Sequence, residues 1–277
     1  MRTRPFDALG WSFVVVSDDD RIVEYVTELY AGLADLESEG IVHEYRIEES
    51  APGEHDLTVD GERLGADGDP SALVATLVHD VNRRAIDTTE LLAVHAGGVV
   101  GAEGAVVLPA HMEAGKTTLT AGLVRAGFGY LTDEAVAFDW DTLDITAYAK
   151  PLSIDPGAWT LFPELEPGAP FEGTGYKANQ WQVPAGAIGA AATTKRAHAR
   201  YVVFPRYRAD ARTELEPIGR AEAVVELARN TFHFRTHGRR ALDALARLVP
   251  SLDCYRMDVG DLGTAVALIG DLAGGTT

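Results

Sequence analysis

The spacing of apolar residues in the N-terminal third of the chain predicts a region that mixes strands and helices. Residues 11–16 are a continuous apolar run, which predicts a buried strand. Apolar residues recur at helical spacing over residues 21–36, which predicts an amphipathic helix. Residues 41–64 predict short strands with a hairpin turn at Asp60–Gly61, and a second helix is expected to begin at Ser71 as its N-cap.

From residue 91 onward the apolar runs are longer. Residues 91–100 and 104–109 are joined by a glycine-containing turn, which predicts a hairpin. A loop then leads to a predicted helix from Lys116 to Ala126, with Gly127 as its C-cap. The later pattern predicts strands over 130–139 and 200–204, and the second strand is expected to stop at Pro205. Loops rich in Pro and Gly are predicted over 151–190, and helices over 220–229 and 238–249.

This change of pattern places a domain boundary near residue 90. Residues 1–90 are predicted to form a small α+β domain, and residues 91–277 a larger α/β domain. The fold class expected for the whole chain is therefore α/β, with an α+β region at its N-terminus.

Composition narrows the class of protein. The chain has 277 residues, 46% of them hydrophobic, and no apolar run long enough for a membrane span. The start of the chain lacks the apolar core of a secretory signal, and the single Cys254 excludes an intramolecular disulfide. We therefore expect a cytoplasmic protein that does not associate with membranes.

Charge is unevenly distributed along the chain. The formal net charge is −18 and the isoelectric point is near 4.7, which argues against nucleic acid as a partner. Residues 195–256 nevertheless carry 13 Lys and Arg against 7 Asp and Glu. This basic stretch is either a set of solvated helix faces or a surface that meets an anionic ligand or the acidic half of the chain.

The candidate chemistry is concentrated in the loop that precedes the helix at Lys116. The phosphate-binding pattern G-x-x-x-x-G-K-[ST] is matched at Gly115, Lys116 and Thr117, whereas Ala110 stands at the position of the first glycine. In such a loop the lysine bridges the β- and γ-phosphates and the threonine hydroxyl binds Mg²⁺. The predicted nucleotide-binding residues are Ala110, His111, Met112, Glu113, Ala114, Gly115, Lys116, Thr117 and Thr118.

Ala110 is the departure from this pattern. If its position requires a positive φ, alanine carries a steric penalty of about 1 kcal/mol or more. The loop then either binds nucleotide weakly or has a variant shape. The side chain of His111 is expected to point out of the loop.

Two adjacent acids follow in the next predicted strand. Asp133 and Glu134 come one helix and one strand after Lys116, so the chain can return beside the loop. Neighbouring residues of a strand point to opposite faces, so one acid is expected to face a metal ion and the other either an acceptor or a residue that supports the site. The alternative is an exposed pair of charges at the end of a strand.

Residues 93–139, which include VHAGGVV and GAVVLPAHMEAGKTTLTAGLVRAGFGYLTDEAVAFD, resemble the catalytic region of the HPr kinase/phosphorylase family. The order of a strand histidine, a phosphate loop, a short helix and a strand with two acids carries this resemblance. It implies a P-loop core similar to phosphoenolpyruvate carboxykinase, with ATP and Mg²⁺ as cofactors. Phosphorylase activity is not implied, because the later glutamate-containing motif of the family is not recognisable.

The resemblance also implies roles for individual residues. Asp133 matches the family's base toward the acceptor hydroxyl. Glu134 replaces the aspartate that lies close to the metal, so Thr117 and Glu134 are the implied metal ligands. His95 matches the strand histidine, and is either a group near the transferred phosphate or a hydrogen-bonded core residue.

The function expected from these residues is transfer of the γ-phosphate of ATP to a hydroxyl of a peptide, a protein or a small molecule, with Lys116, Asp133 and His95 as catalytic residues. The alternative is a non-catalytic nucleotide-binding sensor or scaffold. Members of the family often form oligomers, so a homo-oligomer is possible. Arg206 and Arg208 flank Tyr207 after a predicted strand, and either contact nucleotide or substrate or are ordinary surface arginines.

Overall fold

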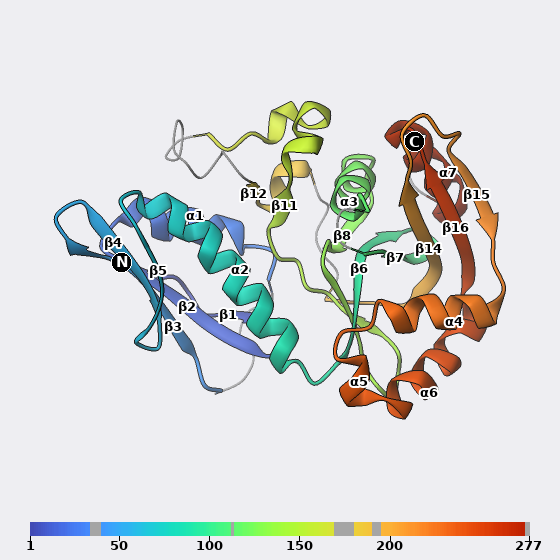
Figure 1. The fold of residues 1–277 in the computed structure, drawn as a ribbon, viewed down its shortest axis with the longest axis horizontal. Coiled ribbons are helices and arrows are strands. Elements are labelled where there is room, and N and C mark those ends of the chain that lie inside the picture. The colour runs from blue at the N-terminus through green and yellow to red at the C-terminus, as the bar shows by residue number, and fades with distance from the viewer. Residues whose placement is uncertain (34–39, 112–113, 169–179, 190–194, 275–277) are drawn as a thin grey trace. The chain divides into compact units, whose positions relative to one another are not determined.

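The computed structural model describes residues 1–33, 40–111, 114–168, 180–189 and 195–274. It is a mixed α/β structure with several sheets, and its chain divides into two compact units (Figure 1). Unit 1 contains Met1–Thr89 and Lys150–Ala187, and unit 2 contains Glu90–Ala149 and Ile188–Thr277. No described helix is both long and apolar enough to cross a bilayer.

Unit 1 is built on one five-stranded sheet with two helices against it. Side chains from alternate positions of β2 and β3, such as Phe13, Val15, Tyr45 and Ile47, are fully buried. The sheet has the order β1-β2-β3-β4-β5, in which only β2 and β3 pair in parallel. The bounds are β1 Phe6–Ala8, β2 Trp11–Ser17, β3 His43–Ala51, β4 Glu54–Val59, β5 Glu62–Asp67, α1 Asp20–Leu29 and α2 Pro70–Thr88.

Both predicted helices of unit 1 exist, with different ends. Helix α1 stops at Leu29, where the next backbone N–H groups bond back into the last turn, and residues 34–36 of the predicted helix lie outside the described residues. The N-cap of α2 is Asp69 and not Ser71, because the carboxylate of Asp69 accepts hydrogen bonds from both the backbone N–H and the hydroxyl of Ser71.

The segment Lys150–Ala187 packs with unit 1 although it lies far along the chain. Its strands β11 (Leu152–Ile154) and β12 (Trp181–Val183) form a separate two-stranded sheet. The hydroxyl of Tyr25 in α1 donates to the backbone carbonyl of Gln182 at 2.9 Å. The sequence suggests a continuous second domain over 91–277, whereas unit 2 does not include Lys150–Ala187. The short 3-10 helices here are η1 Pro156–Leu161, η2 Pro163–Leu165 and η4 Ala185–Ile188.

Unit 2 is built on a larger sheet of order β13-β10-β9-β6-β7-β14-β16-β15, with β8 also paired to β6. The predicted hairpin is confirmed as β6 and β7, and β7, β14 and β16 run in parallel. The carboxyl ends of these three strands therefore lie at one edge of the sheet. The bounds are β6 Leu92–Gly101, β7 Gly104–Pro109, β8 Gly129–Thr132, β9 Ala135–Phe138, β10 Ile145–Thr146, β13 Arg196–Ala197, β14 Ala199–Tyr207, β15 Glu214–Pro217 and β16 Asp253–Val259.

Helices cover the two faces of this sheet (Figure 1). Val94 and Ala96 of β6 face the core that includes Ala223 of α4 and Leu245 of α6. Gly97, one position further on, faces α3, since a Cβ at this glycine would lie 2.3 Å from Thr120 Oγ1. Helices α3 and α4 thus lie on opposite faces. The bounds are α3 Lys116–Arg125, α4 Arg220–Arg229, α5 Phe234–His237, α6 Arg239–Leu248, η5 Val249–Ser251 and α7 Leu262–Ala273.

Two predicted strands of unit 2 differ from the structure. The strand expected over 130–139 is divided into β8 and β9 by a bend at Asp133 and Glu134. Strand β14 continues through Pro205 to Tyr207. A proline is tolerated there because β7 pairs with β14 only as far as Val202, so that one side of β14 has no ladder bonds at Pro205.

Candidate functional site

The predicted phosphate loop connects β7, in the middle of the unit 2 sheet, to α3. Gly115 is the N-cap of α3 and adopts a left-handed conformation with φ of +83°, which an L side chain adopts only at a cost. Ala110 does not adopt a positive φ, so the alanine at the first pattern position carries no steric penalty. Met112 and Glu113 lie outside the described residues.

The side chain of Lys116 points back into the loop that precedes it. It is buried, and Nζ donates to the backbone carbonyls of Ala110 and His111, each at 2.9 Å. Burial lowers the pKa of Lys116 below its usual value, and the nearby carboxylates of Glu134 and Asp133 partly oppose this shift. The ammonium group is therefore held across the loop by two neutral carbonyl oxygens.

The acid Asp133 is placed beside the first turn of α3. It is 2% exposed, and its Oδ2 accepts a hydrogen bond of 3.1 Å from the hydroxyl of Thr117. Its other oxygen, Oδ1, accepts from the hydroxyl of Tyr130 at 3.0 Å. Burial, followed by the charge of Asp133, raises the pKa of Tyr130 well above its usual value, so this hydroxyl keeps its proton and remains a donor.

Glu134 points to a different neighbour. Its Oε1 lies 3.5 Å from Nε2 of His95, and its side chain is 31% exposed. Burial, together with the positive charge of Lys116, lowers the pKa of His95 to about 4. The imidazole is therefore neutral near pH 7, and its contact with Glu134 is polar and not an ion pair.

The bend that separates the two acids has a local cause. The hydroxyl oxygen of Thr132 accepts hydrogen bonds from the backbone N–H groups of Glu134 and Ala135, at 3.2 and 3.3 Å. The backbone carbonyl of Glu134 in turn accepts from Ala96 of β6. This side-chain cap turns the chain so that Asp133 and Glu134 meet different partners, at the point where β6 exchanges pairing with β8 for pairing with β9.

The structure thus brings together most of the residues predicted from the sequence. Lys116, Thr117, Asp133, Glu134 and His95 are joined by the contacts given above, whereas His111 is exposed and Thr118 half-buried on α3. Tyr130 and Thr132 were missed. Their only sequence signal is polar side chains immediately before the acids. Among the described residues, no group of three or more His, Cys, Asp or Glu side chains is placed to hold a metal ion.

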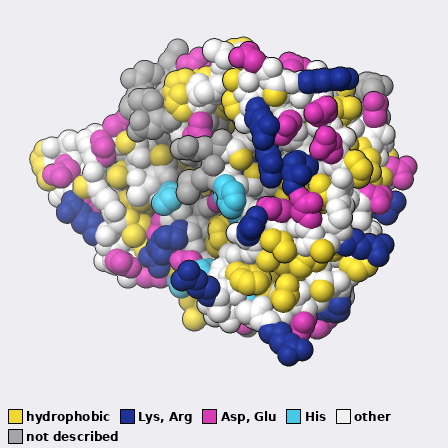
Figure 2. Space-filling view, turned by 45° about the vertical axis from the view of Figure 1, so that its right-hand side comes forward, with side chains coloured by type: hydrophobic (Ala, Val, Ile, Leu, Met, Phe, Trp, Pro, Cys, Tyr) yellow, Lys and Arg dark blue, Asp and Glu magenta, His cyan; other side chains and the backbone are white. Residues whose placement is uncertain are grey.

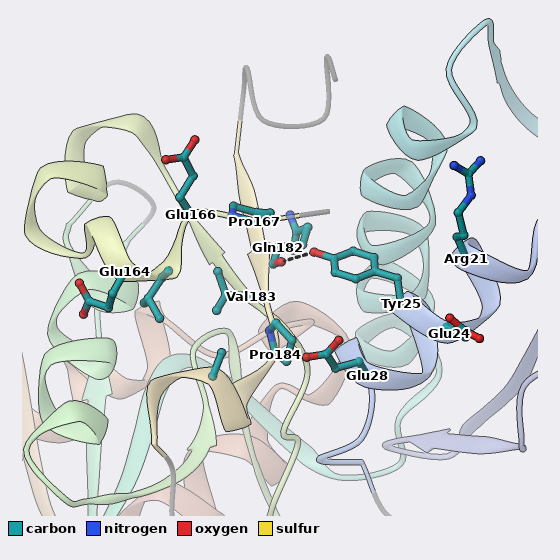
Figure 3. Close-up of a pocket in the computed structure, with 13 residues that line it drawn as sticks. Arg21, Glu24, Tyr25, Glu28, Glu164, Glu166, Pro167, Gln182, Val183 and Pro184 are labelled. Atoms are coloured by element: carbon teal, nitrogen blue, oxygen red, sulfur yellow. Dashed lines mark hydrogen bonds between the residues drawn. The ribbon is translucent and has the colours of Figure 1, made fainter. Parts of the chain in front are cut away.

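A cavity in unit 1 is lined by none of the residues predicted to take part in chemistry. Its volume is about 540 Å³. Figure 3 shows Glu24, Tyr25 and Glu28 on the α1 side, and the Tyr25 hydroxyl bonded to the Gln182 carbonyl. Glu164 and Glu166 line it from the segment before residue 169, so its charged lining residues are four glutamates and Arg21.

No protein-family model matches the chain, and no curated protein matches it significantly. A function must therefore be argued from the residues of the site.

Proposed function

We propose that the chain is an ATP-dependent kinase with a P-loop core similar to phosphoenolpyruvate carboxykinase. In this proposal it transfers the γ-phosphoryl group of ATP to the hydroxyl of an acceptor. The observation that carries the proposal is the contact between Thr117 and Asp133 at the start of a helix whose N-cap is the left-handed Gly115. A hydroxyl paired with a carboxylate behind a phosphate loop is an arrangement suited to a metal-bound triphosphate.

The loop supplies the contacts to phosphate. The N-terminus of α3 carries a partial positive charge, its N-cap Gly115 has no side chain that could cap it, and Lys116 adds a full charge. Lys116 exchanges its bonds to the carbonyls of Ala110 and His111 for bonds to phosphate oxygens. A charge-assisted bond to phosphate is stronger than a bond to a neutral carbonyl, so the exchange favours binding.

The residues present fit a magnesium ion. Mg²⁺ prefers oxygen ligands and is usually held by one or two protein oxygens together with substrate phosphates and water. The Thr117 hydroxyl and the Asp133 carboxylate are such oxygens, 3.1 Å apart. When bound, the ion neutralises charge on the phosphates.

The geometry favours an exchange of the roles that the family resemblance implies for the two acids. Asp133 is almost completely buried and both of its oxygens are engaged, so it suits the metal side and not an incoming acceptor. Glu134 is more exposed and lies beside the neutral His95. We assign Glu134 to the acceptor side, where its carboxylate takes the proton.

In the proposed step one phosphorus–oxygen bond forms and one breaks. The acceptor oxygen forms a bond to the γ-phosphorus, and the bond from this phosphorus to the β–γ bridging oxygen breaks. The bridging oxygen keeps the electron pair and leaves as part of ADP. The acceptor's hydroxyl proton passes to Glu134, and Lys116 stays protonated beside the phosphates throughout.

The test compares purified wild type with Lys116→Ala, Asp133→Asn and Glu134→Gln, measuring ATP turnover across a magnesium titration and a panel of hydroxyl acceptors. Lys116→Ala is expected to lower turnover by about 10³-fold, since it removes the positive charge that stabilises the phosphates in the transition state. Asp133→Asn should raise the magnesium concentration needed for half-maximal turnover. Glu134→Gln should lower kcat with an unchanged magnesium requirement. Circular dichroism checks that each variant is folded.

Unchanged turnover by Lys116→Ala would refute the kinase. A magnesium requirement that moves with Glu134→Gln and not with Asp133→Asn would restore the roles implied by the family. Calorimetry separates the second candidate function, a nucleotide-binding sensor or scaffold. Tight binding of magnesium and ATP without transfer to any acceptor would support that module instead of the enzyme.

A further inference from the structure

The two carboxylate oxygens of Asp133 meet different partners. Oδ2 accepts a hydrogen bond from the hydroxyl of Thr117 at 3.1 Å, and Oδ1 accepts one from the hydroxyl of Tyr130 at 3.0 Å. A carboxylate can only accept hydrogen bonds, so the hydroxyl is the donor in both contacts. The proposed transfer uses Thr117 and Asp133, and it gives the Tyr130 hydroxyl no role.

The two sides of Asp133 differ in access. Thr117 is half-buried in the first turn of α3, whereas Tyr130 is completely buried in β8. Asp133 itself is 2% exposed. A ligand that enters the loop therefore reaches Asp133 from the side of Thr117 and Oδ2, and Oδ1 lies on the closed side.

The sheet fixes the position of the Tyr130 ring. Strand β8 pairs with β6 in antiparallel register, and Tyr130 lies opposite Val99, which is also completely buried. A close-packed interior leaves such a ring little room to turn. The Tyr130 hydroxyl therefore holds Oδ1 in place, and hydrogen bonds to a charged group are among the stronger ones to break.

Divalent cations differ in how they use a carboxylate. Ca²⁺ takes about six to eight oxygen ligands in a flexible arrangement, and it often binds both oxygens of one carboxylate. Mg²⁺ is smaller and demands a near-octahedral arrangement, to which one carboxylate supplies a single oxygen. A carboxylate that offers only Oδ2 therefore suits Mg²⁺, whereas binding of Ca²⁺ through both oxygens requires the bond from Tyr130 to break.

We propose that Tyr130 determines which metal ion the site prefers: its hydroxyl restricts Asp133 to one available oxygen and so favours Mg²⁺ over Ca²⁺. This inference rests on the proposed function, in which Thr117 and Asp133 hold the ion. Tyr130 acts through Asp133, so it is a positioning residue and not a catalytic one.

Acidic side chains outside the site also attract cations. They are scattered over the face of the molecule that Figure 2 shows, and the net charge of the chain is −18. A metal titration would include this binding at the surface. Binding of a nucleotide analogue, measured with each metal in turn, reports on the site alone.

The test measures the dissociation constant of the non-hydrolysable analogue β,γ-imido-ATP by calorimetry, once with saturating Mg²⁺ and once with saturating Ca²⁺. We expect wild type to bind the magnesium complex about tenfold more tightly than the calcium complex, which is about the effect of one hydrogen bond to a charged group. Tyr130→Phe keeps the ring and removes the hydroxyl, so Oδ1 becomes available to Ca²⁺. The two complexes should then bind with about equal affinity.

Tyr45→Phe is the matched control. Tyr45 is also completely buried, and its hydroxyl donates to Oδ2 of Asp80 at 2.8 Å, within unit 1. This variant loses the same kind of bond outside the candidate site. It should therefore lower the stability to urea and leave the preference for the magnesium complex unchanged.

Equal affinity of wild type for the two complexes would overturn the inference without any variant, and this comparison decides alone if Tyr130→Phe does not fold. A preference that is unchanged in Tyr130→Phe, or that changes equally in Tyr45→Phe, would also overturn it. These results would leave the kinase proposal standing. Absence of analogue binding by wild type with either metal would overturn both.

Discussion

His95 shows how the protonation of one residue depends on the site around it. Burial and the positive charge of Lys116 lower its pKa from 6.5 to about 4. At pH 7.5 the imidazole is neutral in both the folded and the unfolded chain. Below pH 6.5 the unfolded chain binds a proton at this position, whereas the folded protein does so only near pH 4. The stability linked to His95 is thus complete above pH 6.5 and is lost as the pH falls toward 4.

Replacement of His95 should remove this loss. We expect the difference in unfolding free energy between wild type and His95→Gln to change by about 2 kcal/mol in favour of the variant between pH 7.5 and pH 4.5. Urea titrations at several pH values measure it. His79→Gln, at an exposed position of α2, controls for the substitution of a histidine by glutamine itself. A constant difference between wild type and His95→Gln across this range would contradict the assigned pKa.

The turn into α3 could be predicted from the sequence because it depends on residues that are neighbours in the chain. Gly115, Lys116 and Thr117 stand next to one another in the chain, so a local pattern was sufficient. The partners of the two acids could not be predicted in this way. Which acid meets Thr117 depends on the cap formed by Thr132 and on the hydrogen bond from β6, and the second of these is a contact between distant segments.

At the scale of elements, the contact between β6 and α3 positions the loop. Gly97 allows α3 to lie directly on the sheet, because a Cβ there would lie 2.3 Å from Thr120 Oγ1. Thr120 is completely buried, and its hydroxyl has no hydrogen-bond partner in the part of the chain that the structure describes. The sheet and the helix are therefore so close at this point that position 97 has no room for a side chain.

A double-mutant cycle tests this contact. We expect Gly97→Ala to destabilise the protein by about 2 kcal/mol, since added volume in a packed interior forces α3 to shift. Thr120→Ala should be close to neutral, because it removes a hydroxyl that is not satisfied. The double variant should recover most of the stability lost in Gly97→Ala. Urea unfolding measures all three, and additive effects would show that the two positions do not interact.

The elements that could be predicted are those in which the local pattern and the final packing agree. The hairpin of β6 and β7 and the helices α3, α4 and α6 have clear apolar periodicity and end signals. Strand β14 was predicted to stop at Pro205, but it continues to Tyr207. A proline is tolerated there because β14 lacks a partner strand on its β7 side beyond Val202, and this pairing cannot be predicted from the local sequence. Strand β16 and helix α7 were not predicted from the pattern at all.

The assignment of Lys150–Ala187 to unit 1 belongs to the scale of the whole molecule. The hydrogen bond between Tyr25 and Gln182 joins residues that are 157 positions apart. No local pattern carries such information, so the sequence placed one boundary near residue 90 and left this segment in the second domain. The chain in fact leaves unit 2 after Ala149 and returns to it at Ile188.

The net charge of −18 is also a property of the whole molecule and leads to a prediction. Like charges repel one another in the compact state, and salt screens this repulsion, since the Debye length shortens from about 30 Å at 0.01 M to about 10 Å at 0.1 M. We expect the midpoint of thermal unfolding at pH 7.5 to rise by about 3–5 °C when NaCl is raised over this range, measured by calorimetry without nucleotide.

Near the isoelectric point of about 4.7 the net repulsion disappears, so the same titration should leave the midpoint almost unchanged or lower it. KCl at equal concentration controls for effects of a particular cation. A midpoint that falls with salt at pH 7.5 would mean that attractive pairs, such as that between Arg84 and Asp80, outweigh the net repulsion.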